Sequence, residues 1–153
     1  MVKSILLTVI FFISLSSCSY QKMIPSQQEF TIEEIEINGN RRSSFLIERK
    51  IKRYSQEDSQ NKLAISINLN TNKNIHEKNI QNKVTKYKLS LTAETNIKNL
   101  KTLEIIKRSY SSNTTYNVEE KYNETLNNEK DARSRLIDEV VNQLLDELRI
   151  NYN

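Results

Sequence analysis

Glycine, cysteine, histidine and proline each occur only once in the 153 residues, and tryptophan is absent. A single glycine excludes the glycine-rich phosphate cradles of nucleotide-binding folds, because those loops need several residues that are free to adopt positive φ. One histidine and one cysteine cannot supply the three or four nitrogen and sulfur ligands of a zinc site. A serine or cysteine hydrolase would depend wholly on His76, which lies in a segment that we expect to be a polar loop. We therefore expect a protein that is not an enzyme and that needs no metal or cofactor.

Apolar runs are also few, and the main one lies at the amino terminus. It extends from Ile5 to Ile13 and follows Lys3, which is the only charged residue before Cys18. A membrane-spanning helix needs about 20 apolar residues, so this run is too short to be one. A positive start, a short apolar run and an exit of small residues are typical of a secretory signal peptide, which we predict over residues 1–17.

The exit from this run reads Leu15-Ser16-Ser17-Cys18, which resembles the lipobox of bacterial lipoproteins. The resemblance implies cleavage before Cys18 and a lipid anchor on its sulfur, labelled by palmitate, with residues 18–29 forming the lipidated cysteine and a tether. Ser19 in the next position implies sorting to the periplasmic side of the outer membrane. The alternatives are an ordinary signal peptide with a chance cysteine, or a buried first strand. Acyl chains contribute about 0.8 kcal/mol for each buried CH2, so such an anchor would be effectively permanent.

Residues 30–150 carry the periodicities of one small domain. Alternating apolar residues predict strands from their spacing, and the polar segments between them predict loops. An Asn38-Gly39-Asn40 turn precedes a predicted helix that is capped by Ser43 or Ser44 and ends near Ser55. The predicted strands cover residues 30–38 (with a bulge at Glu33-Glu34), 63–69, 86–93 and 100–110, and the predicted loops cover residues 70–83 and 111–117.

The last predicted element is a helix from Glu129 to Arg149, with apolar residues at three- and four-residue spacing and acids on its other side. At about 31 Å it would cross a four-stranded sheet, although such a stripe could also be a coiled-coil seam. The order is then β-α-β-β-β-α. We predict a single α+β domain, in which two helices pack on one face of a mainly antiparallel sheet of about four strands.

Positive charge is concentrated in two segments. Residues 41–53 hold six basic residues against Glu48 alone, and residues 73–108 hold nine basic residues against three glutamates. These basic residues could simply form a solvated surface. Alternatively, they could form a surface that binds an anionic partner. The export signal argues against nucleic acid as that partner.

The whole order of elements resembles the LptE family of lipopolysaccharide-assembly lipoproteins. This order is the signal, a first strand, a turn, a basic helix, three further strands and a long final helix. Residues 32–54 look like that family's first strand and helix, and residues 110–148 look like its last strand end and final helix. The run EKDARSRL (Glu129 to Leu136) is the most family-like. The middle strands match in pattern only. Ser19-Tyr20 also differs from the Gly-aromatic-Pro start that is frequent in the family.

The resemblance implies an outer-membrane subunit that plugs the lumen of LptD, a large β-barrel, and assists the assembly of lipopolysaccharide into the outer leaflet by non-covalent binding. The alternative is an auxiliary lipoprotein of a phospholipid or ABC-type envelope transport complex. A third hypothesis, a secreted hydrolase, would rest on His76.

Strand alternation selects candidate contacts for lipopolysaccharide or for the partner. If Tyr87 and Leu89 point toward the helices, Lys86 and Lys88 lie on the opposite face. If Leu103 and Ile105 also point inward, Arg108 joins them there. The other phase of the fourth strand would place Lys107 there instead. The candidates are therefore Lys86, Lys88, Lys107 and Arg108.

Overall fold

The computed structural model describes residues 30–57 and 59–152, so the predicted signal peptide, Cys18 and the tether lie outside the described residues. The described elements are β1 (Phe30–Asn38), α2 (Arg41–Lys52), β2 (Asn61–Lys78), β3 (Val84–Asn99), β4 (Ile105–Asn117) and α3 (Tyr122–Tyr152). The predicted α+β class and the order β-α-β-β-β-α are confirmed.

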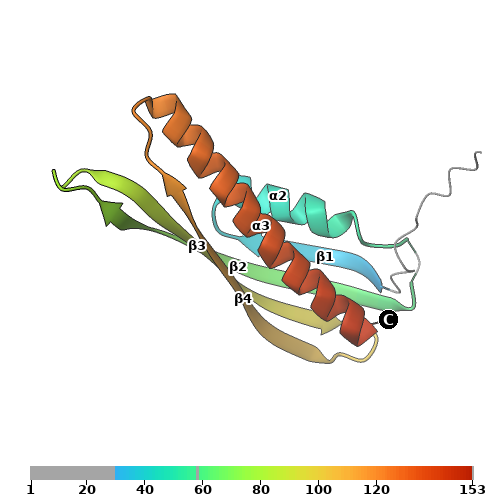
Figure 1. The fold of residues 1–153 in the computed structure, drawn as a ribbon. Helices are drawn as coiled ribbons and strands as arrows, with labels where there is room; N and C mark the ends of the chain where they lie inside the picture. The colour runs from blue at the N-terminus through green and yellow to red at the C-terminus, as the bar shows by residue number, and fades with distance from the viewer. Residues whose placement is uncertain (1–29, 58, 153) are drawn as a thin grey trace, which may run out of the picture.

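The four strands lie side by side in the order β1-β2-β3-β4. β1 and β2 are parallel and are connected by α2, whereas β2, β3 and β4 follow one another as antiparallel neighbours. The predicted bulge in β1 is present, because the register with β2 shifts between Ile32 and Glu34. Both helices lie on the same face of the sheet, with α3 running obliquely across it (Figure 1).

The core lies between this sheet face and the two helices. The predicted apolar stripe of the last helix is buried, and α2 adds Ile47 and Ile51 to it. Burying a side chain of the size of Leu or Ile contributes about 2 kcal/mol, so α3 is the largest single source of apolar stabilisation. Its buried residues are Ala132, Leu136, Ile137, Val140, Val141, Leu144, Leu145, Leu148 and Tyr152.

The start of α2 differs from the prediction, because Asn40 caps the helix rather than Ser43 or Ser44. The Asn40 side-chain oxygen accepts hydrogen bonds from the backbone N–H groups of Arg42 (3.2 Å) and Ser43 (3.3 Å). This satisfies two of the N–H groups that a helix start leaves without partners. The helix ends at Lys52, before the predicted Ser55, whose hydroxyl instead accepts a hydrogen bond from the Ile32 N–H.

Two segments that we predicted to be loops are strands. The predicted loop 70–83 shrinks to residues 79–83, because β2 and β3 pair along a long hairpin. The predicted loop 111–117 is the second half of β4, which is paired with β3 throughout. Cross-strand pairing here overrides the weak strand preference of Asn and Lys. We call the distal part of the β2–β3 hairpin, residues 73–89, the arm, and its tip extends past the helices (Figure 1).

The fourth strand begins at Ile105 rather than at Leu100, and its predicted inward residues are wrong. Leu103 lies in a turn with φ of 61° and is 66% exposed, and Ile105 is 55% exposed. The turn forms because the Asn99 side chain accepts hydrogen bonds from the N–H groups of Lys101 and Thr102, which ends β3 at Asn99. Ile106 packs against the core in place of its neighbours.

Candidate functional site

The sheet face opposite the helices, which we call the open face, is uncovered in the described part of the chain. Its central field consists of hydroxyl and amide side chains, because every second residue of three strands is Asn, Ser or Thr. Glu94 is the only charged residue within this field. The field comprises Asn68, Asn70 and Asn72 of β2, Ser90 and Thr92 of β3, and Ser109, Ser111 and Asn113 of β4.

Lys86 and Lys88 lie at the arm end of the open face, as predicted. Their neighbours Tyr87 and Leu89 point to the helix side, where Tyr87 stacks on Tyr116 with ring centres 5.7 Å apart. Lys86 is not free, because its ammonium lies 2.6 Å from the Glu77 carboxylate. The hydrogen bond from Lys86 and its positive charge hold the pKa of Glu77 below its usual value.

The prediction that Arg108 points outward is wrong, and the alternative phase with Lys107 outward is correct. Arg108 lies on the helix side, where its Nε donates to Glu147 of α3 at 2.9 Å. Lys107 is opposite Asn96 in the β3–β4 register, whereas Lys88 is opposite Thr115. The eight positions from Lys88 to Asn96 span about 26 Å at about 3.3 Å each. The structure therefore separates Lys107 from the Lys86–Lys88 pair.

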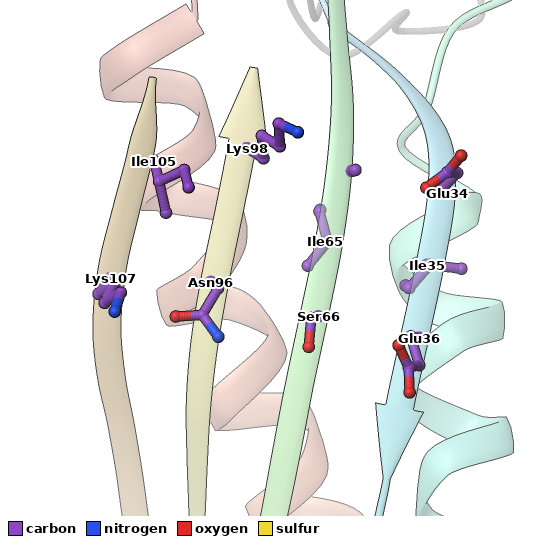
Figure 2. A pocket seen from close by; sticks show the side chains of 10 residues that line it. Glu34, Ile35, Glu36, Ile65, Ser66, Asn96, Lys98, Ile105 and Lys107 are labelled. Carbon is purple, nitrogen blue, oxygen red and sulfur yellow. The ribbon is translucent and has the colours of Figure 1, made fainter. Parts of the chain in front are cut away.

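Lys107 instead lines a hollow of about 460 Å³ at the other end of the open face. Figure 2 shows Glu34 and Glu36 on β1 at one side of this hollow, and Lys98 and Lys107 on β3 and β4 at the other. Uncharged side chains of β2 and β3 lie between the two sides, so the hollow has an acidic and a basic side. Neither lysine forms an ion pair within the described residues.

Sequence reasoning missed Lys98 because it lies beyond the predicted end of its strand at Ala93. The alternation of Glu34 and Glu36 with Ile35 and Ile37 was a visible signal that both carboxylates share the open face. Only the strand register brings them level with Lys98 and Lys107.

A charged cluster that the sequence did not predict ties the arm to α3. The Glu129 carboxylate accepts hydrogen bonds from Lys73 (2.6 Å), Tyr116 (2.8 Å) and Arg133 (2.9 Å). The Lys73 ammonium also lies 4.4 Å from the centre of the Tyr87 ring, which favours a cation–π contact. Lys73 falls in the segment that we predicted to be a loop. Without a strand there, nothing in the sequence placed its side chain on the helix side of the sheet.

The pKa values in this cluster reflect burial that is opposed by hydrogen bonding. Burial alone would raise the pKa of Glu129, but the hydrogen bonds from Lys73, Tyr116 and Arg133 outweigh it and hold the pKa below the usual value. Burial alone would lower the pKa of Lys73, but its bonds with Glu129 and Tyr116 raise it. Both shifts favour the charged pair.

His76 lies exposed in β2, at an irregularity in the register between Ile75 and Glu77. Among residues 30–57 and 59–152, no three His, Cys, Asp or Glu side chains come together as a metal site. None of the helices in those ranges is both long and apolar enough to cross a membrane.

No protein-family model matches the chain, and no curated protein matches it significantly. Solved structures do match. The chain has the fold of three lipoproteins. A Caulobacter crescentus CB15 protein described as a lipoprotein aligns over 76% of this chain and 88% of its own, with a TM-score of 0.52 and 14% identity. Rare lipoprotein B from Shewanella oneidensis aligns over 77% and 97%, with a TM-score of 0.53 and 9% identity. A minor lipoprotein from Acinetobacter baumannii aligns over 83% and 95%, with a TM-score of 0.55 and 16% identity.

Proposed function

We propose that the chain is an outer-membrane lipoprotein of the LptE type, which plugs the lumen of an LptD-type β-barrel and assists lipopolysaccharide assembly without catalysis. The observation that carries the proposal is the open face, whose central field is hydroxyl and amide in character with Glu94 as its one charge. The fold shared with three lipoproteins agrees with it.

The chemistry of the open face suits the inside of an outer-membrane barrel, which is polar. Hydroxyl and amide groups can exchange their bonds with water for bonds with a polar wall at a small net cost. A face full of charges would instead pay a large desolvation penalty on docking. The core lies entirely on the helix side of the sheet. The open face can therefore contact a polar partner without any change in the core.

The anchor is the second part of the proposal, and it rests on the residues around Cys18. Cys18→Ser should abolish labelling by palmitate and leave a chain whose signal peptide is uncleaved or miscleaved. The measurement is metabolic labelling of wild type and variant at equal expression. Palmitate on the Cys18→Ser chain would contradict the lipobox.

Lys86 and Lys88 are the proposed contacts for the acidic groups of lipopolysaccharide, and Lys107 with Lys98 forms a second basic site on the same face. A charge-assisted contact contributes about 1.5–3 kcal/mol, so Lys86→Glu/Lys88→Glu should weaken lipopolysaccharide binding by about one to three decades. The measurement is the affinity of the chain without residues 1–18 at two salt concentrations, alongside its melting curve.

The matched control is Lys121→Glu/Lys130→Glu, directly before and in the first turns of α3, which makes the same change of charge away from the open face. It should leave lipopolysaccharide affinity within about twofold, since exposed helix charges are screened. Equal loss in both variants would show a general charge effect. Unchanged affinity in Lys86→Glu/Lys88→Glu with normal melting would show that these lysines only solvate the sheet.

Copurification separates this proposal from its alternatives. An LptD-type barrel recovered with the chain from outer membranes supports the proposal. An ABC-type or MCE-type transport component in its place supports the alternative of an auxiliary lipoprotein in phospholipid transport. A hydrolase would require turnover of a substrate that is abolished by a change at His76.

A further inference from the structure

Helix α2 exposes a basic arc that the proposed function does not use. Its inner side packs Ile47 and Ile51 into the core, where they are at most 1% exposed. With 3.6 residues per turn, its exposed residues fall within about 120° of the helix circumference. This arc consists of Arg41, Arg42, Phe45, Arg49, Lys52 and the capping residue Arg53.

The cations of this arc are largely without carboxylate partners. Glu48 is the only acid between Arg41 and Arg53, and it pairs with Lys52 at 2.7 Å. In residues 30–57 and 59–152, no ion pair involves Arg41, Arg42, Arg49 or Arg53. Lys50, on the side that faces α3, is instead paired with Asp138. The four cations without an ion pair therefore all lie on the exposed side of α2.

Phe45 lies in the middle of this arc and is 60% exposed. The guanidinium of Arg49 lies 5.8 Å from the centre of its ring, and no core contact requires a phenyl group there. An aromatic residue set among unpaired arginines is typical of a helix that lies in the interface of an anionic membrane. The aromatic ring enters the headgroup region while the arginines bind lipid phosphates.

We propose that α2 docks flat, through this arc, on the anionic phospholipid surface of the membrane that holds the chain. The inference takes the anchor at Cys18 from the proposed function. The twelve residue steps from Cys18 to Phe30 reach at most about 40 Å. The segment that follows α2 returns to Phe30, whose carbonyl accepts a hydrogen bond from the Gln56 N–H at 3.1 Å, four residues beyond the last residue of the helix. An anchored chain therefore keeps α2 within reach of the bilayer.

The helix lies on the other side of the sheet from the open face (Figure 1), so docking through α2 describes the anchored chain before its open face meets a barrel wall. Each basic residue at an anionic surface strengthens membrane partitioning about fivefold. Replacing Arg41 and Arg49 by Gln should therefore weaken docking about 25-fold without removing the lipid anchor. Their exposure means that the fold should be unaffected.

The absence of tryptophan makes Phe45→Trp a unique fluorescent reporter. We would reconstitute the acylated Phe45→Trp chain into phosphatidylcholine vesicles with and without phosphatidylglycerol, and measure its emission and its quenching by brominated acyl chains. We expect a blue shift and quenching in the anionic vesicles only. Both effects should be lost with Arg41→Gln/Arg49→Gln, whereas the control Lys130→Gln/Arg135→Gln on α3 should retain them.

A second reporter, Tyr122→Trp, tests the start of α3, where Tyr122 is 73% exposed. It should keep the emission of a solvated indole in both kinds of vesicle. Solvent-like emission at position 45 in chains that float with anionic vesicles would overturn the docking while leaving the anchor intact. Equal quenching in neutral vesicles, or equal quenching at positions 45 and 122, would also overturn it. Failure to float with either vesicle would overturn the anchor and the docking together.

Discussion

Glu129→Gln tests whether the cluster that joins the arm to α3 stabilises the fold. The substitution keeps the shape of the side chain but removes the charge that accepts bonds from Lys73, Tyr116 and Arg133. It would leave two cations facing a neutral amide. The arm would lose its main polar connection to the helix layer.

The size of the effect follows from the exposure of the partners. The side chains of Glu129, Arg133 and Lys73 are 21%, 28% and 41% exposed, so the cluster is intermediate between a buried and a surface ion pair. Breaking a buried pair costs about 3–5 kcal/mol, and breaking an exposed pair costs about 0–1 kcal/mol. We expect Glu129→Gln to lower the free energy of unfolding by about 2 kcal/mol, which corresponds to about 8 °C in Tm for a domain of this size.

Urea and thermal unfolding of the chain without residues 1–18 measure this effect. The matched control is Glu124→Gln, on the same helix, whose exposed pair with Lys121 should be worth less than about 0.5 kcal/mol. Equal changes in Tm for the two variants would refute the reasoning, because they would show that solvent screens the Glu129 cluster as fully as a surface pair.

The pH dependence gives an independent check with a definite sign. The pKa of Glu129 is lowered in the folded chain, so its contribution is complete above the ordinary value of 4.5 and is lost as the pH falls through the folded pKa. The pKa of Lys73 is raised, so its contribution is complete below 10.5 and is lost as the pH rises through the folded pKa. The difference between wild type and Glu129→Gln should therefore be constant from about pH 5.5 to 9.5 and shrink outside that range.

Three further substitutions test the core and a turn, each by its melting curve. Gly39→Ala should cost about 1–3 kcal/mol, because φ is 140° and the added methyl would lie 2.8 Å from Leu69 Cβ; an unchanged Tm would contradict this. Leu144→Asp/Leu145→Asp should prevent folding by burying charge, and a folded variant with normal melting would show that the α3 stripe is not core. Tyr110→Phe should keep or raise stability, because the Tyr110 hydroxyl is buried with no partner among the described residues, and burial, aided by Glu147, raises its pKa to about 12. A loss of about 1 kcal/mol or more in Tyr110→Phe would show that the hydroxyl has a partner.

The fold was predictable from the sequence wherever a long segment keeps a single spacing of its apolar residues. The α3 stripe from Ala132 to Leu148 and the alternation of β2 from Leu63 to Leu69 were both found, because one side of each element is buried. The first turns of α3, residues 122–128, were missed, since they expose most of their side chains and so carry no apolar period. The arm was missed for the same reason.

The phase of β4 was not predictable from its apolar residues. Leu103 and Ile105 suggested one phase, but the turn at Asn99 leaves both exposed, and the inward residues include Ser112 and Tyr116. The open face was found in part, because Lys86 and Lys88 alternate with core residues. The hollow with Lys98 and Lys107 depends on strand register, which no local pattern encodes.

The proposed contact between the open face and an LptD-type barrel can be tested by site-specific photocrosslinking in intact outer membranes. A photoreactive residue at Ser111, in the middle of the open face, should give a large adduct that contains this barrel by mass spectrometry. The same residue at Asn142, on the exposed side of α3, is the matched control and should not give it. An adduct from Ser111 with a component of an ABC-type transport complex, or no adduct from Ser111 in correctly anchored chains, would contradict the account.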